Sequence, residues 1–177
     1  EHYYLERALG PFSELSTGSL EELMDSELAV IVLPDLGALP PDGIEALGAW
    51  IEAGGVVLRF AGPRLAQGSD ALVPVALRRG GRAFGGAMSW SQPATLAPFA
   101  ATTPFAGLTI PDDVTVTRQV LAQPSPDLEA RTWVSLSDGT PLVTAERRGA
   151  GWLVLFHTTA NPDWSDLSLS GLFVRML

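Results

Sequence analysis

His157 is the residue whose type and position best suit acid–base chemistry. It directly follows the apolar run Leu153–Phe156, and an imidazole can accept or donate a proton near neutral pH. Asp163 or Asp35 could place a carboxylate beside it. Such a pair could act as acid and base in a hydrolase or transferase that needs no protein nucleophile. The alternative is a hydrogen-bonded histidine at a strand end, without a chemical role.

Three further candidate ligand contacts follow His157 in one turn-rich segment: Asn161, Asp163 and Trp164. They could line the same pocket as the histidine. Asn-Pro-Asp is also an ordinary turn sequence, in which Asn and Asp side chains bond to their own backbone. Both interpretations, ligand contact and turn formation, stay open at this point.

The segment Ala61–Arg64 could hold an anion. Pro63 suits the first turn of a helix, where unpaired N–H groups attract negative charge, and Arg64 adds a cation. A carboxylate or phosphate would be the ligand, and Asp35 could point into the same crevice. Alternatively, Arg64 pairs with an acidic residue, and Asp35 forms a turn with the proline before it.

The composition removes several kinds of chemistry. The chain has no cysteine, which excludes thiol nucleophiles, thiolate metal sites and disulfides. Its two histidines lie far apart and show no ligand spacing, so we predict no metal site and no cofactor. The formal net charge of -9 argues against a nucleic-acid partner, because binding phosphates requires a basic face.

A strand, a helix and a second strand are predicted to position two of these segments. Ala29–Leu33 is a continuous run rich in β-branched residues, typical of a strand buried in a parallel sheet. A helix follows, with Pro41 in its first turn and Gly54–Gly55 at its end. Val56–Phe60 is the second strand and completes a βαβ unit.

The second half of the chain has a different pattern. From about residue 67 to 128 the helical period is lost, which predicts a loop-and-strand insertion. Three strands joined by tight glycine-containing turns then predict an antiparallel meander; they are Arg131–Leu136, Leu142–Arg147 and Trp152–His157. A final helix should pack on the sheet through an apolar stripe; its members are Leu169, Leu172, Phe173 and Met176.

Together these elements predict one α/β domain over residues 1–177. Its length favours a single domain, with a mainly parallel central sheet, flanking helices and antiparallel strands near the C-terminal end. In such sheets, ligands bind outside the carboxyl ends of the strands. Asp35, Ala61–Arg64 and His157–Trp164 all follow predicted strands, so we expect them to share one crevice.

Both ends of the sequence are interpreted as cuts within a longer protein. The chain begins at Glu1 without a targeting signal and ends inside an apolar helical pattern. Helices are predicted for Tyr3–Leu9 and Leu20–Met24, and we expect a first strand to precede Glu1. No apolar run approaches the roughly 20 residues of a membrane helix.

The turn Ala61–Gly62 and the late strand that ends at His157 resemble class I glutamine-amidotransferase-like domains. Active members place a cysteine on that turn and the base histidine at the end of that strand. More closely, most of the chain resembles the central domain of bacterial membrane proteins with an N-terminal double-transmembrane region, related to aerotolerance-operon proteins. That likeness is carried by Tyr3–Leu9, Arg59–Leu65 and Thr140–Met176. It implies a flavodoxin-like three-layer sandwich.

The chain departs from the active pattern at the nucleophile. Neither Ala61 nor Gly62 can form an acyl intermediate, and Pro63 has no N–H to complete an oxyanion hole behind Gly62. If Ala61 holds the position, Gly62 could still donate, but no nucleophile exists. We therefore expect a catalytically inactive amidotransferase-like domain that binds a small ligand or a protein. The resemblance places it in a membrane-anchored envelope protein, on the periplasmic side.

Two surface features remain. Arg78–Arg82 is the one basic cluster and predicts a solvated hairpin face, with a membrane or partner contact as the alternative. Trp90, within the insertion, is a candidate for surface recognition.

Overall fold

The computed structural model describes residues 1–78 and 87–177, with side chains from residue 92 onward in the second range. Positions 79–82 of the basic cluster and the Trp90 side chain lie outside this description. The helices are α1 (His2–Leu9), α2 (Leu20–Met24), α3 (Pro41–Glu52), α4 (Pro63–Gln67), α5 (Leu128–Arg131), the 3-10 helix η1 (Asp166–Leu169) and α6 (Gly171–Met176). The strands are β1 (Val30–Leu33), β2 (Val56–Phe60), β3 (Ala87–Thr95), β4 (Thr115–Val120), β5 (Thr132–Ser135), β6 (Pro141–Arg148) and β7 (Gly151–Phe156).

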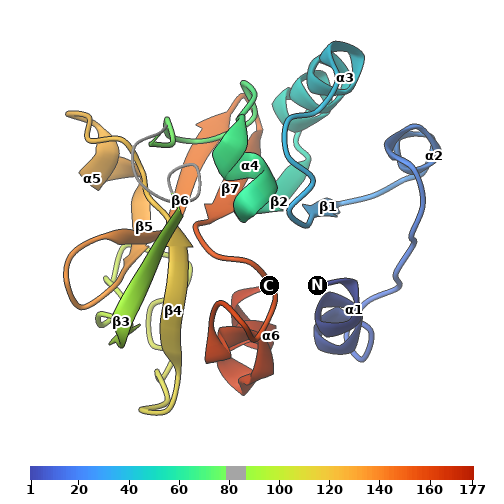
Figure 1. The fold of residues 1–177 in the computed structure, drawn as a ribbon. Coiled ribbons are helices and arrows are strands. Elements are labelled where there is room, and N and C mark those ends of the chain that lie inside the picture. Colours follow the sequence, from blue (N-terminus) through green and yellow to red (C-terminus); the bar gives the residue numbers. More distant parts are fainter. Residues whose placement is uncertain (79–86) are drawn as a thin grey trace.

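Five strands form the central sheet, in the order β1-β2-β7-β6-β5. The first three are parallel, whereas β6 runs antiparallel to both β7 and β5. The register pairs Leu33 with Arg59 and Phe60 with Phe156, so β1, β2 and β7 end at the same edge (Figure 1). The predicted α/β class and the C-terminal antiparallel meander are confirmed.

The β1-α3-β2 unit forms where local sequence signals predict it. Pro40 and Pro41 begin α3, where a missing N–H costs nothing. Leu47 and Ile51 are completely buried against the sheet, as helical spacing requires. Gly54 has a φ of +126°, a conformation that disfavours residues with a Cβ, and it turns the chain from α3 into β2.

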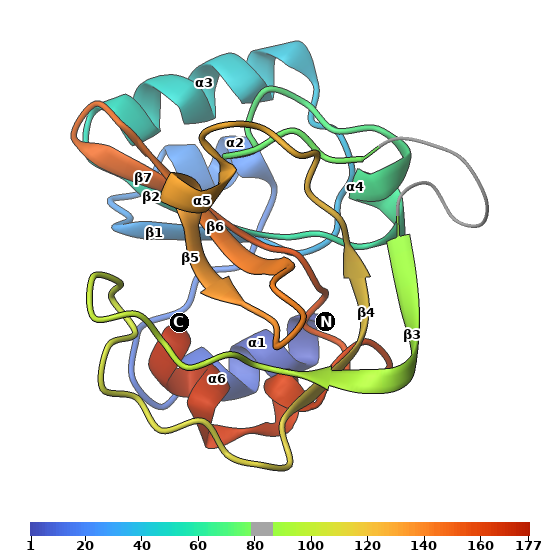
Figure 2. The same cartoon turned by 90° about the vertical axis from the view of Figure 1, so that its left-hand side faces the viewer.

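Helices cover both faces of the sheet (Figure 2). On the α3 side the core contains Ile31 and Val57. On the other side, α1 and α6 pack on a larger cluster, in which the rings of Phe60 and Phe156 stack with centroids 4.8 Å apart. β1 forms one edge of the sheet, with only β2 as a neighbour.

Arg59 is a charged residue inside the buried strand β2. Its guanidinium is 2.6 Å from Asp70 and also donates to the carbonyl oxygens of Gly37 and Leu72. Burial disfavours the charged form of Asp70, but the Arg59 hydrogen bond and backbone N–H groups outweigh it and lower the pKa of that carboxyl. These hydrogen bonds connect the loops that contain Gly37 and Leu72 to strand β2.

The segment between α4 and α5 contains a separate two-stranded antiparallel sheet of β3 and β4. β4 passes beside the residues that follow β7: the Val120 N–H donates to the His157 carbonyl at 2.7 Å, and the Thr117 N–H to that of Trp164 at 2.8 Å. The insertion therefore covers one side of the strand ends.

One predicted core position is wrong. Leu169 is 62% exposed, because it ends η1 and does not belong to α6. Leu172, Phe173 and Met176 are buried as predicted. Within the described ranges, no helix has the length and apolar character to cross a membrane.

Candidate functional site

The three predicted segments meet at the carboxyl ends of β1, β2 and β7. The Ala61 N–H donates to the carbonyl oxygen of Phe156 at 2.8 Å, which joins the segments after β2 and β7. A Cβ placed on Gly62 would lie 2.5 Å from Asp35 Oδ2 and 2.5 Å from Thr159 Cγ2. The structure therefore brings all three segments into direct packing contact.

Asp35 binds the first turn of α4. Its Oδ2 accepts the Arg64 N–H at 2.9 Å and its Oδ1 accepts the Leu65 N–H, also at 2.9 Å. The side chain is buried. The predicted anion position at Pro63 and Arg64 thus holds a carboxylate of the protein itself, which uses the N–H groups that a free anion would need.

Glu1, which the sequence analysis did not single out, adds a second carboxylate. Its Oε2 accepts the Asp35 N–H at 3.3 Å, and its Oε1 is buried with no partner in the described part of the chain. Burial raises the pKa of the Glu1 carboxyl, and the Asp35 carboxylate adds to this, while the N–H groups of Asp35 and Ala160 oppose it.

The His157 ring is hydrogen-bonded to groups of β6 and β4. Its Nε2 is 3.0 Å from Thr144 Oγ1 and its Nδ1 is 2.8 Å from the Val120 carbonyl oxygen. That carbonyl can only accept, so Nδ1 carries the proton and Nε2 accepts the Thr144 hydroxyl. The ring is fully buried, and burial lowers the pKa of His157 to about 4. It is a neutral histidine whose hydrogen bonds connect the end of β7 to β6 and β4.

No carboxylate completes an acid–base pair with His157 in the described residues. Asp35 accepts the α4 N–H groups, and Asp163 is exposed. The Asn161 Oδ1 accepts the Asp163 N–H at 3.0 Å, which is the turn that the sequence alternatively predicted.

Trp164 is buried next to the Ala61–Gly62 turn. Its ring is buried in a cluster with Ala61 and Leu65, and its carbonyl accepts N–H groups from β4. Ala61 is completely buried. A ligand could therefore reach Ala61 only if the side chains packed around it moved.

Arg64 directs its side chain to solvent. Within residues 1–78 and 87–177 it forms no ion pair. Over the same ranges, no cluster of three His, Asp or Glu side chains is arranged to hold a metal ion.

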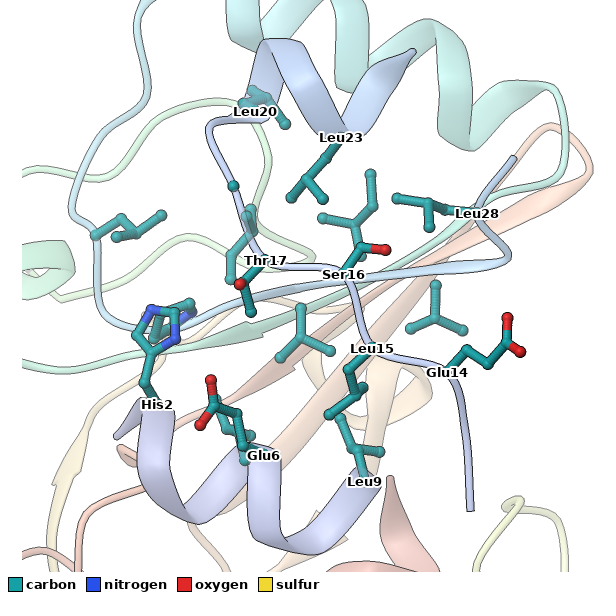
Figure 3. A pocket seen from close by; sticks show the side chains of 18 of the residues that line it. His2, Glu6, Leu9, Glu14, Leu15, Ser16, Thr17, Leu20, Leu23 and Leu28 are labelled. Carbon is teal, nitrogen blue, oxygen red and sulfur yellow. The ribbon is translucent and has the colours of Figure 1, made fainter. Parts of the chain in front are cut away.

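A groove beside the edge strand β1 was not predicted from the sequence. A cavity of about 250 Å³ lies between α1, α2, the outer edge of β1 and the segment Glu14–Gly18 (Figure 3). Three of the large exposed apolar side chains line it: Leu15, Val30 and Leu36. The available signal was the apolar residues within an otherwise polar stretch, such as Phe12 and Leu15.

The sequence matches no protein-family model and no curated protein. Solved structures with a similar fold include two Salmonella typhimurium proteins. Cytoplasmic Protein STM3548 is 15% identical with a TM-score of 0.69, covering 98% of this chain and 82% of its own. Cytoplasmic Protein STM1381 is 14% identical with a TM-score of 0.68, covering 92% and 77%.

A third similar structure is the β-galactosidase of the Antarctic haloarchaeon Halorubrum lacusprofundi. It is 20% identical, with a TM-score of 0.52 over 78% of this chain but only 20% of its own. At these identities the three structures share the fold with this chain, and this carries no information on activity.

Proposed function

We propose that this chain is a catalytically inactive amidotransferase-like domain that binds a protein partner. The closed strand ends carry the proposal. Asp35 accepts the first N–H groups of α4, Trp164 and Ala61 are buried in one apolar cluster, and both ring nitrogens of His157 are bonded inside the chain. The place where α/β sheets bind small ligands is filled by the protein's own side chains.

The finer fold assignment, a flavodoxin-like three-layer sandwich, belongs to this proposal. It is supported by the parallel strands β1, β2 and β7 and by helices on both sheet faces (Figure 2). The absence of catalysis is supported by the chemistry of the turn, since Ala61 and Gly62 offer no nucleophile and Pro63 no N–H.

A protein partner is favoured over a small ligand because exposed apolar side chains gather around the groove at β1. Val30 is 44% exposed and Leu15 is 42% exposed. Exposed apolar patches on folded domains commonly mark contacts with other proteins. A partner could bury this groove.

The cellular setting rests on the resemblance alone, which supports a domain on the periplasmic side of a membrane-anchored envelope protein. Cell fractionation tests this part. The protein should sediment with membranes and become protease-accessible in spheroplasts. Recovery with the cytosolic proteins would contradict it.

A turnover measurement tests the absence of catalysis. The protein is incubated with glutamine and with chromogenic esters, amides and glycosides, beside the variants His157→Ala and Asp163→Ala. We expect no turnover that depends on either residue. Asp163 is exposed, so Asp163→Ala should fold normally even if His157→Ala does not. Turnover that disappears in both variants would establish the hydrolase or transferase alternative and overturn the proposal.

A further inference from the structure

The outer edge of β1 has backbone groups without partners. The Val56 N–H donates to the Ala29 carbonyl oxygen, and Val30 lies opposite Val56 in the parallel register. Alternate residues of a strand therefore bond to β2, and those between them, Val30 and Val32, direct N–H and C=O groups outward. In the described part of the chain these groups accept and donate no hydrogen bond.

A second polypeptide segment faces this edge across the groove. Residues 14–17 have no regular secondary structure, and their backbone groups likewise form no hydrogen bond within the described ranges. They line the groove together with β1. Figure 3 shows Leu15, Ser16 and Thr17 along this wall. The groove thus lies between two stretches of unpaired backbone.

The remaining walls are apolar. α1 contributes Leu5 and Leu9, and α2 contributes Leu20 and Leu23; Figure 3 shows Leu9, Leu20 and Leu23 around the opening. A site with unpaired backbone at its sides and leucines above and below fits an extended, apolar peptide segment, because strand addition satisfies the backbone while side chains fill the pockets.

The negative charge around the groove favours basic residues at an end of that segment. Residues 1–28 contain seven acidic residues and one arginine. Glu6 and Glu14 belong to the groove itself. Complementary charge on a partner would speed its approach and disfavour acidic competitors.

We propose that the outer edge of β1 accepts a β-strand from a protein partner: an extended segment with an apolar centre and arginine or lysine at one end. The inference rests on the proposed protein-binding function and names its site and the chemistry of its partner. A second copy of this chain fits less well, because pairing two β1 edges would bring two acidic rims together.

The test uses a synthetic peptide, Arg-Arg-Val-Leu-Val-Leu-Val-Ser, and measures binding together with amide hydrogen exchange. We expect saturable binding and slower exchange at the amides of Val30 and Val32. A peptide with two glutamates in place of the arginines should bind at least tenfold more weakly. N-methylation of alternate peptide N–H groups, which removes their hydrogen bonds, should reduce binding by a similar factor.

Matched variants locate the site. Val30→Lys places a charge in the groove at a residue that is already partly exposed, and should weaken binding at least tenfold. Leu169→Lys makes the same kind of change at an exposed leucine that does not line the groove, and should leave binding unchanged. Equal binding by the two variants would overturn the inference.

The other occupants are separate outcomes. Protection of the Val30 and Val32 amides that grows with protein concentration alone would assign the edge to a second copy. The Glu1 carboxylate contacts the Asp35 N–H just beyond β1, so the peptide can also be fused ahead of Glu1 to run parallel to β1. Protection only in this fused form would assign the strand to the same polypeptide. Either result would overturn the inference that the strand comes from a partner protein.

Failure of the inference and failure of the proposed function give different results. Absence of peptide binding in every form, with no His157-dependent turnover, overturns only the strand-addition site. Turnover that depends on His157 and Asp163 overturns the proposed function itself, whatever the peptide does.

Discussion

The carboxyl ends of the strands and the outer edge of β1 differ in whether their polar groups are hydrogen-bonded within the chain. At the strand ends, Asp35 accepts the N–H groups of α4 and both nitrogens of His157 are bonded. At the β1 edge, the outward backbone groups of Val30 and Val32 have no partner in the described residues. Asp35 and His157 are thus paired within the chain, although Glu1 Oε1 and Thr159 Oγ1 are buried nearby without a partner in the described residues. The outward groups of the β1 edge are exposed and available for pairing.

This difference indicates which region of the molecule can bind a partner. Polar groups that are buried and paired contribute to stability, and opening them costs the free energy of desolvated, unpaired atoms. An exposed strand edge instead presents a row of N–H and C=O groups with which another strand can pair. In this chain, side chains of the protein fill the strand ends, while the edge of β1 stays exposed.

The largest effect is expected from Asp35→Ala. The substitution leaves the N–H groups of Arg64 and Leu65 without their acceptor in a buried position, and each unpaired group costs about 1–3 kcal/mol. We expect the free energy of unfolding in urea to fall by about 4 kcal/mol. Asp163→Ala, at an exposed aspartate near the same edge, should change it by less than about 0.5 kcal/mol. Similar losses in the two variants would show that the strand ends are not held by Asp35.

The second effect depends on pH. The pKa of His157 is lowered to about 4 in the folded protein but returns to about 6.5 on unfolding. Between these values the unfolded state binds a proton that the folded state does not, so stability falls as the pH falls from 6.5 to 4. The full loss is about 3 kcal/mol, from the shift at about 1.4 kcal/mol per unit.

Urea unfolding at several pH values, compared with His157→Gln, isolates this contribution. The variant cannot titrate at this position, so its stability should fall less steeply with acid. The carboxyl groups titrate in both proteins, so their contribution to the pH dependence cancels when the two profiles are subtracted. Parallel pH profiles would mean that the ring is accessible to protons, contrary to a closed strand end.

The third effect comes from Gly62→Ala. A Cβ there would lie 2.5 Å from Asp35 Oδ2 and from Thr159 Cγ2, and overpacking of this kind costs about 2 kcal/mol. Gly48→Ala in α3 is the control, because nothing lies within 4 Å of its Cβ. It should stabilise the protein slightly, since alanine favours the helix more than glycine does. A melting temperature for Gly62→Ala equal to that of the unmodified protein would contradict close packing at the turn.

The local elements were predictable because their signals are local. Apolar runs and helix-ending glycines indicated β1, α3 and β2, and glycine-containing turns indicated the antiparallel meander of β5, β6 and β7. The sequence also placed Asp35, Gly62 and His157 at strand ends. It could not predict the direction of the His157 ring, because its partner Val120 comes from an insertion whose path depends on tertiary contacts.

The β1 groove was not predicted for a related reason. Leu15 and Val30 are ordinary apolar residues in the sequence, and exposure depends on what surrounds them in the fold. An unpaired edge is visible only when the whole strand order is known, since every strand carries the same backbone groups. The groove therefore became visible only once the strand order showed that β1 pairs with β2 on one side and with no described strand on the other.

The smallest effect on stability is expected in the groove. Leu15 is 42% exposed, so Leu15→Ser should change the free energy of unfolding by less than about 0.5 kcal/mol. Leu5→Ala, at a buried leucine of α1, should instead cost about 2–4 kcal/mol. Urea unfolding compares the two. If Leu15→Ser leaves stability intact but weakens binding of the arginine-containing peptide, apolar side chains in the groove serve recognition. A large stability loss would make Leu15 part of the core and remove the contrast between the two regions.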